Sequence, residues 1–155
     1  MDWKTLFFSA DGRIGRSTFW VGWLVLLGVN VVLGWIPFIG GALSLASIYC
    51  NVCVTSKRLH DMGKSGFLQV WPWMLFIALG VGSIIMVAGP AIVAGLSNAD
   101  ESAVMAAVFA GLGAMLLAQL AAFGVVIGFV LWVGVSTGDP GDNRYGPPPV
   151  TPPAV

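Results

Sequence analysis

The chain has 155 residues, of which 57% are hydrophobic and 9% are charged, and its formal net charge at pH 7 is zero. A soluble domain usually carries about 25% charged residues. A chain of this length with so few charges could not cover its own surface in water, so the composition excludes an ordinary soluble protein. It predicts an integral membrane protein, and we expect no nucleic-acid partner.

The charged residues leave three long gaps in the sequence. They are absent from 17–56, 65–99 and 102–138, which are stretches of 40, 35 and 37 residues. One spanning helix needs roughly 20 apolar residues, so the first gap is long enough for two spans and each of the others for one long span. The sequence therefore predicts an all-α polytopic fold of four transmembrane helices arranged as two hairpins. This single membrane domain would cover 1–146, followed by a Pro-rich tail over 147–155.

The first half of the chain predicts one short helix and two spans. Residues 1–9 mix aromatic and charged side chains, which is typical of a short amphipathic helix in the headgroup region. The first span is expected from about Thr18 to Trp35, with Ser17 as its N-cap. A turn over 37–41 should end it, because proline removes a backbone donor and glycine relaxes the backbone. The second span is expected over 42–56, with its helix continuing towards His60.

The second half predicts two long spans. The third should run from after Gly66 to about Gly95, and Pro90 should kink or end it. The fourth is expected over 99–135, with Asn98 as its N-cap. At 1.5 Å per residue it would be about 55 Å long, against a hydrocarbon core of about 30 Å, so it must tilt, bend or project from the membrane.

The positions of the basic residues predict the orientation. All seven Lys and Arg fall in the N-terminal segment, the joint at 57–64 and the C-terminal segment. Four spans place these three segments on one side of the membrane, and the positive-inside rule makes that side cytoplasmic. We therefore expect both termini in the cytoplasm.

Small and polar residues within the spans predict where helices pack. Alanine recurs at every fourth position from Ala106 to Ala122, and glycines at 124 and 128 follow. Small residues at this spacing let another helix approach closely, and amides in lipid need hydrogen-bond partners. The residues expected at helix interfaces are Asn30, Ala110, Ala114, Ala118, Gln119, Gly124 and Gly128.

The joint between the second and third spans holds the single histidine of the chain, His60, beside Asp61. The two could act as an acid–base pair. Adjacent helical residues diverge, however, so a structural ion pair of Asp61 is favoured. The partners expected for Asp61 are Lys57, Lys64 or an arginine of another segment, with Arg16 and Arg144 the best candidates.

Other short motifs predict no catalytic residue, metal or cofactor. Cys50 and Cys53 lie within an apolar helix, and His60 is about 10 Å of helical rise from Cys53, too far for a shared metal. Gly63-Lys64-Ser65 resembles the end of a phosphate-binding loop but lacks the first glycine and the preceding strand.

Three segments carry a family resemblance, namely Gly12 to Trp20, Arg58 to Phe67 and Gly138 to Pro147. Their order and spacing resemble the domain-of-unknown-function 805 family of small bacterial inner-membrane proteins over nearly the whole chain. The pairing of Arg-Leu-His-Asp with Asn-Arg-Tyr-Gly-Pro is the specific part. A tryptophan is common in the family where Phe67 stands here. The resemblance implies a bacterial inner-membrane location and implies no activity.

The leading functional hypothesis is a non-enzymatic membrane protein with a basic cytoplasmic cap that binds anionic lipid headgroups or a partner protein. The alternative is a small-solute channel or transporter formed as an oligomer, and a membrane enzyme using His60 and Asp61 ranks third. The residues expected to make the contacts of the cap are Arg13, Arg16, Lys57, Arg58, His60, Asp61, Lys64, Asn143, Arg144 and Tyr145.

Overall fold

The structure, a computed structural model, describes residues 2–36, 38–97 and 100–149. Within these ranges it is helical and contains no β-strand. The elements in chain order are α1 (Trp3–Phe8), α2 (Arg16–Leu33), α3 (Ile39–Asp61), a 3-10 turn (Gly66–Gln69), α4 (Val70–Leu96) and α5 (Glu101–Val135).

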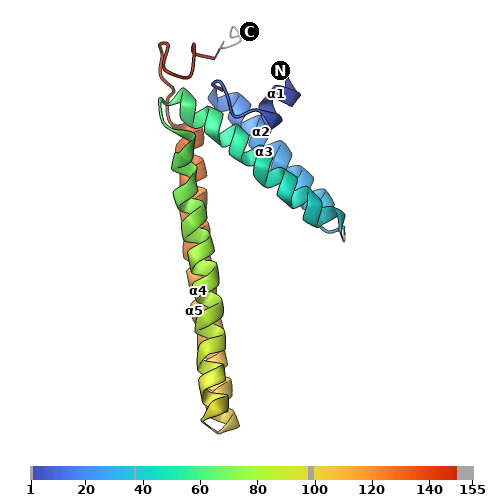
Figure 1. The fold of residues 1–155 in the computed structure, drawn as a ribbon, viewed down its shortest axis with the longest axis vertical. Coiled ribbons are helices and arrows are strands. Elements are labelled where there is room, and N and C mark those ends of the chain that lie inside the picture. Colours follow the sequence, from blue (N-terminus) through green and yellow to red (C-terminus); the bar gives the residue numbers. More distant parts are fainter. Residues whose placement is uncertain (1, 37, 98–99, 150–155) are drawn as a thin grey trace. The chain divides into compact units, whose positions relative to one another are not determined.

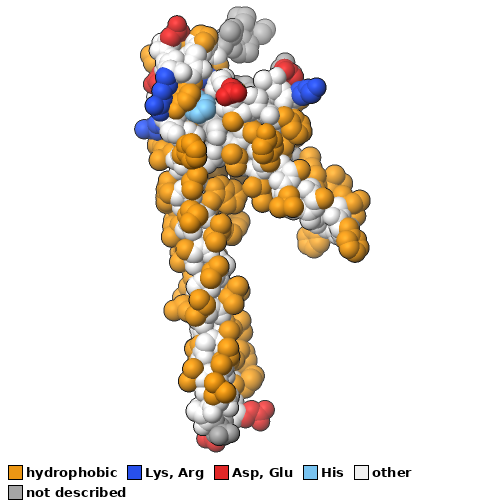
Figure 2. Space-filling model, in the orientation of Figure 1, with side chains coloured by type: hydrophobic (Ala, Val, Ile, Leu, Met, Phe, Trp, Pro, Cys, Tyr) orange, Lys and Arg blue, Asp and Glu red, His pale blue; other side chains and the backbone are white. Residues whose placement is uncertain are grey.

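Four of the described helical stretches are long and apolar enough to cross a membrane, as the charge-free gaps predict. They are Arg16–Leu33, Ile39–Asp61, Gly66–Leu96 and Glu101–Val135. Most of their large hydrophobic side chains are exposed in the isolated chain, and Figure 2 shows such side chains along the helices. An apolar surface of this extent is typical of helices that face lipid.

The chain forms two compact units. The first contains Met1–Gln69 and Leu131–Val155, and the second contains Val70–Val130. In the first unit α2 and α3 lie side by side, with α1 packed against α3 (Figure 1). In the second unit α4 lies beside α5 (Figure 1).

The short N-terminal helix is present as α1, and local bonds explain where it begins. The carboxylate of Asp2 accepts from the backbone N–H of Lys4 at 3.1 Å and from the hydroxyl of Thr5. This satisfies donors that the first turn of a helix leaves unpaired. Leu6 is buried, and it lies close to Gly22 of α2. Helix α1 is therefore fixed to the α2–α3 pair.

The start of α2 and the turn after it differ from the prediction. Helix α2 begins at Arg16 with Gly15 as N-cap, so the expected cap at Ser17 is wrong. In the following turn Phe38 adopts φ 64°, a strained value for a residue with a side chain. Helix α3 already begins at Ile39 and therefore includes Gly40. A Cβ at Gly40 would collide with the backbone oxygen of Gly34, which explains the glycine there.

Pro90 does not end the third long helix, which continues to Leu96. Proline has no N–H, so the carbonyl of Met86 loses its usual helical partner. On the neighbouring helix, Gly111 approaches that carbonyl closely, and an added Cβ would lie 2.9 Å from Met86 O and 3.0 Å from Val87 Cα. The carbonyl of Met86, which Pro90 leaves without a helical partner, and the close approach of Gly111 therefore occur at the same place, where α5 packs on α4.

The small residues of α5 contact α4 only in part. Ala114 and Ala118 are half-buried, but Ala110 is exposed. Added Cβ atoms at Gly124 and Gly128 would meet no atom within 4 Å. The prediction that these two glycines pack closely against another helix is therefore wrong within the described chain. The face of α5 that packs on α4 instead includes Gly111, which lies close to Met86 O and Val87, and Gln119, which lies close to Gly80. The expected N-cap Asn98 lies outside the described residues.

Candidate functional site

Three segments that are far apart in the sequence meet in the first unit, as predicted. They are residues 12–20, the end of α3 with the following turn over 57–67, and residues 138–147. We call these three segments together the polar junction. Arg13 of the first segment bonds to Asp61 of the second and to three carbonyl groups of the third, and Asp139 N donates to Asp61 O at 2.7 Å.

Asp61 is held between two arginines at the centre of the junction. Its Oδ1 is 3.1 Å from both Nε and Nη2 of Arg13, and its Oδ2 accepts from Nη1 of Arg58. The side chains of both pairs are 1% exposed for arginine and 5% exposed for aspartate. The predicted bond between Asp61 and an arginine of another segment is thus confirmed. The predicted donors Arg16 and Arg144 were wrong, since Arg13 supplies the bond and Arg58 adds a contact within α3.

Arg13 uses its whole guanidinium group inside the junction. Nη1 donates to the carbonyls of Gly141 at 2.8 Å and Gly146 at 3.0 Å, and Nη2 donates to the carbonyl of Asp139 at 2.6 Å. With the bond from Nε to Asp61, four of the five N–H groups of the guanidinium have acceptors, and Nη2 adds a close ionic contact to the same carboxylate. One side chain therefore fixes the path of the C-terminal segment.

Arg58 joins the end of α3 to the end of α5. Its Nε donates to Val133 O at 3.1 Å, its Nη2 donates to Ser136 O, and its Nη1 lies 3.5 Å from Ile14 O. The last carbonyls of a helix lack partners within the helix, and a cation is favourable there. Arg58 is fully buried. Its positive charge is therefore matched by Asp61 and by the negative end of α5.

The C-terminal segment ends in a tight turn that docks on His60. Asn143 and Gly146 exchange backbone hydrogen bonds, and Gly146 has φ 115°, which favours glycine. The amide of Asn143 donates to His60 O at 3.0 Å and to Asp139 Oδ2 at 3.1 Å. The ring of Tyr145 stacks on that of His60 with centroids 3.7 Å apart. The turn therefore presents Asn143 and Tyr145 to α3.

A family model described as a protein of unknown function (DUF805) matches residues 7–147. The chain belongs to the DUF805 family. Two relatives are the uncharacterized proteins YiiR of Escherichia coli strain K12 and of Escherichia coli O157:H7. Each is 39% identical over 82 residues, which cover 44% of this chain and 53% of the relative. The match therefore spans about half the length of these curated relatives. No solved structure matches the chain.

The basic residues of this DUF805 chain fall into two groups. Arg13, Lys57 and Arg58 point inward, and Lys57 donates to the carbonyls of Thr5 and Leu6 near the end of α1. These three bind the protein itself, which corrects the expectation that they face lipid or a partner. The residues that remain exposed are Lys4, Arg16, Lys64 and Arg144.

Aromatic rings lie beside two of the exposed cations. Lys64 Nζ is 5.7 Å from the ring centroid of Trp132, and Arg144 Cζ is 4.7 Å from that of Tyr145. Arg16 approaches the carbonyl of Val135 at 3.4 Å. Cations near aromatic rings at the ends of apolar helices are typical of a membrane–water interface.

The geometry of His60 and Asp61 in the DUF805 fold does not resemble an acid–base pair. Nδ1 of His60 lies 3.3 Å from the carbonyl of Gly12. A carbonyl only accepts, so this nitrogen is the donor in that contact. Asp61 is bound by two guanidinium groups instead of by His60. Among the described residues, no group of three or more His, Cys, Asp or Glu is arranged to hold a metal ion.

The two amides predicted within the spans differ in their bonding. Asn30 of α2 donates to Ser47 of α3 at 2.8 Å and to its own Leu26 O at 2.7 Å, so the interhelical bond is confirmed. Gln119 of α5 is different, because its buried Oε1 has no hydrogen-bond partner within the described chain. Ser83 of α4 lines the same cavity as Gln119, but its hydroxyl donates to Leu79 O of its own helix.

Proposed function

We propose that this protein crosses the bacterial inner membrane four times as two hairpins, with both termini in the cytoplasm. The support is the unequal distribution of charge. The N-terminal segment, the joint and the C-terminal segment hold seven basic and five acidic residues, a net charge of +2, whereas the stretch from the end of α4 to the start of α5 holds only Asp100 and Glu101. Basic residues near the ends of spans are retained on the cytoplasmic side.

This topology predicts a one-sided labelling pattern. In a background with Cys50 and Cys53 replaced by Ala, cysteine introduced at Asp100 should react with a membrane-impermeant thiol reagent in intact cells. Cysteines at Lys64 and Asp142, which are both exposed in the structure, should react only after the cells are opened. Labelling at Asp142 from outside would contradict the two-hairpin topology.

We further propose that the polar junction is a non-enzymatic binding surface for anionic lipid headgroups. The observation that carries this proposal is the division of the cations. Arg13 and Arg58 bond inside the junction and Lys57 bonds to α1, whereas Arg16, Lys64 and Arg144 remain exposed. A basic side chain near an anionic leaflet contributes about 1 kcal/mol. The rigid core would hold these exposed side chains at fixed positions.

The headgroup proposal predicts lipid retention that depends on charge. The Arg16→Gln, Lys64→Gln and Arg144→Gln changes should each weaken binding of phosphatidylglycerol about fivefold, from ~1 kcal/mol per cation. Native mass spectrometry of the purified protein would measure the bound lipid.

The matched control for this experiment is Asp142→Asn, which removes an exposed negative charge from the same segment. It should leave binding unchanged or strengthen it. Binding of zwitterionic phosphatidylethanolamine should not change in any variant. Equal retention of phosphatidylglycerol by the wild type and the combined triple variant would contradict the proposal, and a partner protein that remains bound would favour the protein-docking hypothesis.

A further inference from the structure

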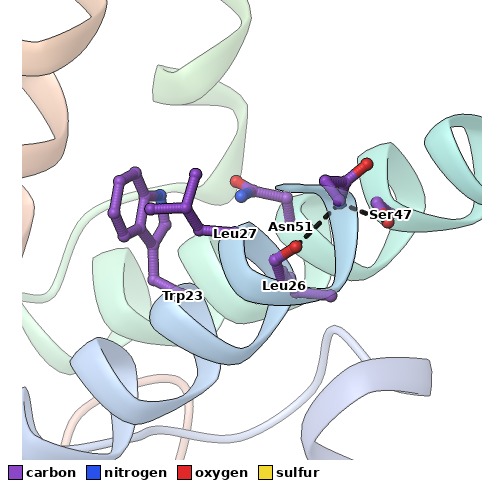
Figure 3. Close-up of a pocket in the computed structure, with 6 residues that line it drawn as sticks. Trp23, Leu26, Leu27, Ser47 and Asn51 are labelled. Atoms are coloured by element: carbon purple, nitrogen blue, oxygen red, sulfur yellow. Dashed lines mark hydrogen bonds between the residues drawn. The ribbon is translucent and has the colours of Figure 1, made fainter. Parts of the chain in front are cut away.

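A cavity lined by three apolar and three polar side chains lies between α2 and α3, away from the polar junction. Its volume is about 170 Å³, and Figure 3 shows the side chains around it. One water molecule occupies about 30 Å³ in the liquid, so the cavity has room for a group of several non-hydrogen atoms. The lining residues are Trp23, Leu26, Leu27, Asn30, Ser47 and Asn51.

The polar groups of this cavity are only partly paired. Asn30 uses its amide N–H groups on Leu26 O and Ser47 Oγ, and Asn51 Oδ1 accepts from Thr55 at 3.2 Å. Within the described chain, Asn30 Oδ1, the Ser47 hydroxyl hydrogen and the Asn51 amide N–H groups have no partner among the hydrogen bonds formed. An unpaired amide is unfavourable in a bilayer, because no water is present there to bond it.

The free groups lie at different depths along the helices. Asn30 of α2 and Ser47 of α3 are hydrogen-bonded at 2.8 Å and therefore lie at one level, and Asn51 is four residues, about 6 Å, further along α3. In the two-hairpin arrangement proposed above, Asn30 and Ser47 lie nearer the outer side of the membrane than Asn51. The amide of Asn51 lies deeper, on a level with apolar side chains.

We propose that this cavity binds the glycerol–ester part of a neutral, diacylglycerol-type lipid that enters sideways from the bilayer. Among the described residues no charged side chain lines the cavity, so none of them compensates the phosphate of a phospholipid. Such a lipid offers one hydroxyl and two ester carbonyls. The hydroxyl donates to Asn30 Oδ1, and the carbonyls accept from Ser47 and Asn51. One acyl chain then continues along Leu27 and Trp23.

Photocrosslinking of the full-length protein in nanodiscs tests this site. The probe is a diacylglycerol with a diazirine on one acyl chain, and mass spectrometry locates the labelled peptide. Label should appear on α2 or α3 of the wild type. Asn51→Leu and Ser47→Ala should each reduce it about three- to tenfold, the range expected for one lost hydrogen bond. The same probe with its hydroxyl acetylated should label less.

The matched control is Gln119→Leu, which removes an amide from α5 and should leave the labelling of α2 and α3 unchanged. Ser47→Ala removes a single hydroxyl and keeps the test decisive if Asn51→Leu fails to fold. Equal labelling of the wild type and Ser47→Ala, or equal labelling by the acetylated probe, would overturn the proposal. The position that the probe labels does not depend on which side of the membrane the termini occupy. A negative result here therefore leaves the proposed topology untouched, and a negative result in the cysteine test leaves the lipid site untouched.

Discussion

The Asp61→Asn change should cause the largest loss of stability of any single substitution in the polar junction, about 3–5 kcal/mol of unfolding free energy. The carboxylate of Asp61 separates two buried guanidinium groups, and each bonds to one of its oxygens. A neutral amide fits the same space but leaves two positive charges close together with no compensating negative charge. The junction should then open, and residues 138–147 should become accessible to protease.

Thermal unfolding in detergent and limited proteolysis of the C-terminal segment would measure this effect. Asp142→Asn is the matched control, because Asp142 is an exposed acid of the same segment. His60→Gln should have an intermediate effect, since it removes the stacking on Tyr145 but leaves every charge paired. If Asp61→Asn and Asp142→Asn unfold at the same temperature, the role assigned to Asp61 is wrong.

A methyl group at Gly138 should also disrupt the junction, by about 1–3 kcal/mol. A Cβ at this position would overlap the carboxylate of Asp61. The backbone cannot easily move away, because the next residue, Asp139, donates its N–H to Asp61 O at 2.7 Å. The Gly138→Ala change would therefore push the carboxylate away from its arginine partners.

Gly141→Ala provides the matched comparison for this prediction. An added Cβ at Gly141 meets no atom within 4 Å, although its carbonyl accepts from Arg13 in the same way as its neighbours do. Both variants add one methyl group to a glycine of the same segment, but only the Cβ at position 138 overlaps another side chain. Equal melting temperatures of Gly138→Ala and Gly141→Ala in detergent would show that the approach of Gly138 to Asp61 does not matter for stability.

The number and type of the long helices could be predicted because the signal is local. Length, apolarity and the absence of charge decide whether a stretch can form a spanning helix. Helix ends near glycine and proline were harder to predict. Pro90 lies inside α4, so the loss of one backbone hydrogen bond there does not end the helix.

The sequence was less informative about which partners meet. The charge balance indicated that Asp61 needs an arginine, but the choice among Arg13, Arg16 and Arg144 depends on the path of the chain before α2 and after α5. The burial of Lys57 could not be read from the sequence either, because it depends on the docking of α1. Small residues repeated along one face of a helix allow close packing but do not specify which helix packs there. The predicted helix contacts of Gly124 and Gly128 are therefore wrong within the described chain.

Arg13 and Arg58 bond to carbonyl groups of residues near the C-terminus, which are synthesised last, and this has a consequence for biosynthesis. A ribosome completes Arg13, Arg58 and Asp61 long before it adds Val133, Ser136, Gly141 and Gly146, whose oxygens these arginines require. During that interval the guanidinium groups have no route to burial and must remain hydrated. The last step of maturation is therefore set by the arrival of residues 133–146. A nascent chain that stops before them would share the single carboxylate of Asp61 between two arginines whose other N–H groups have no protein acceptor.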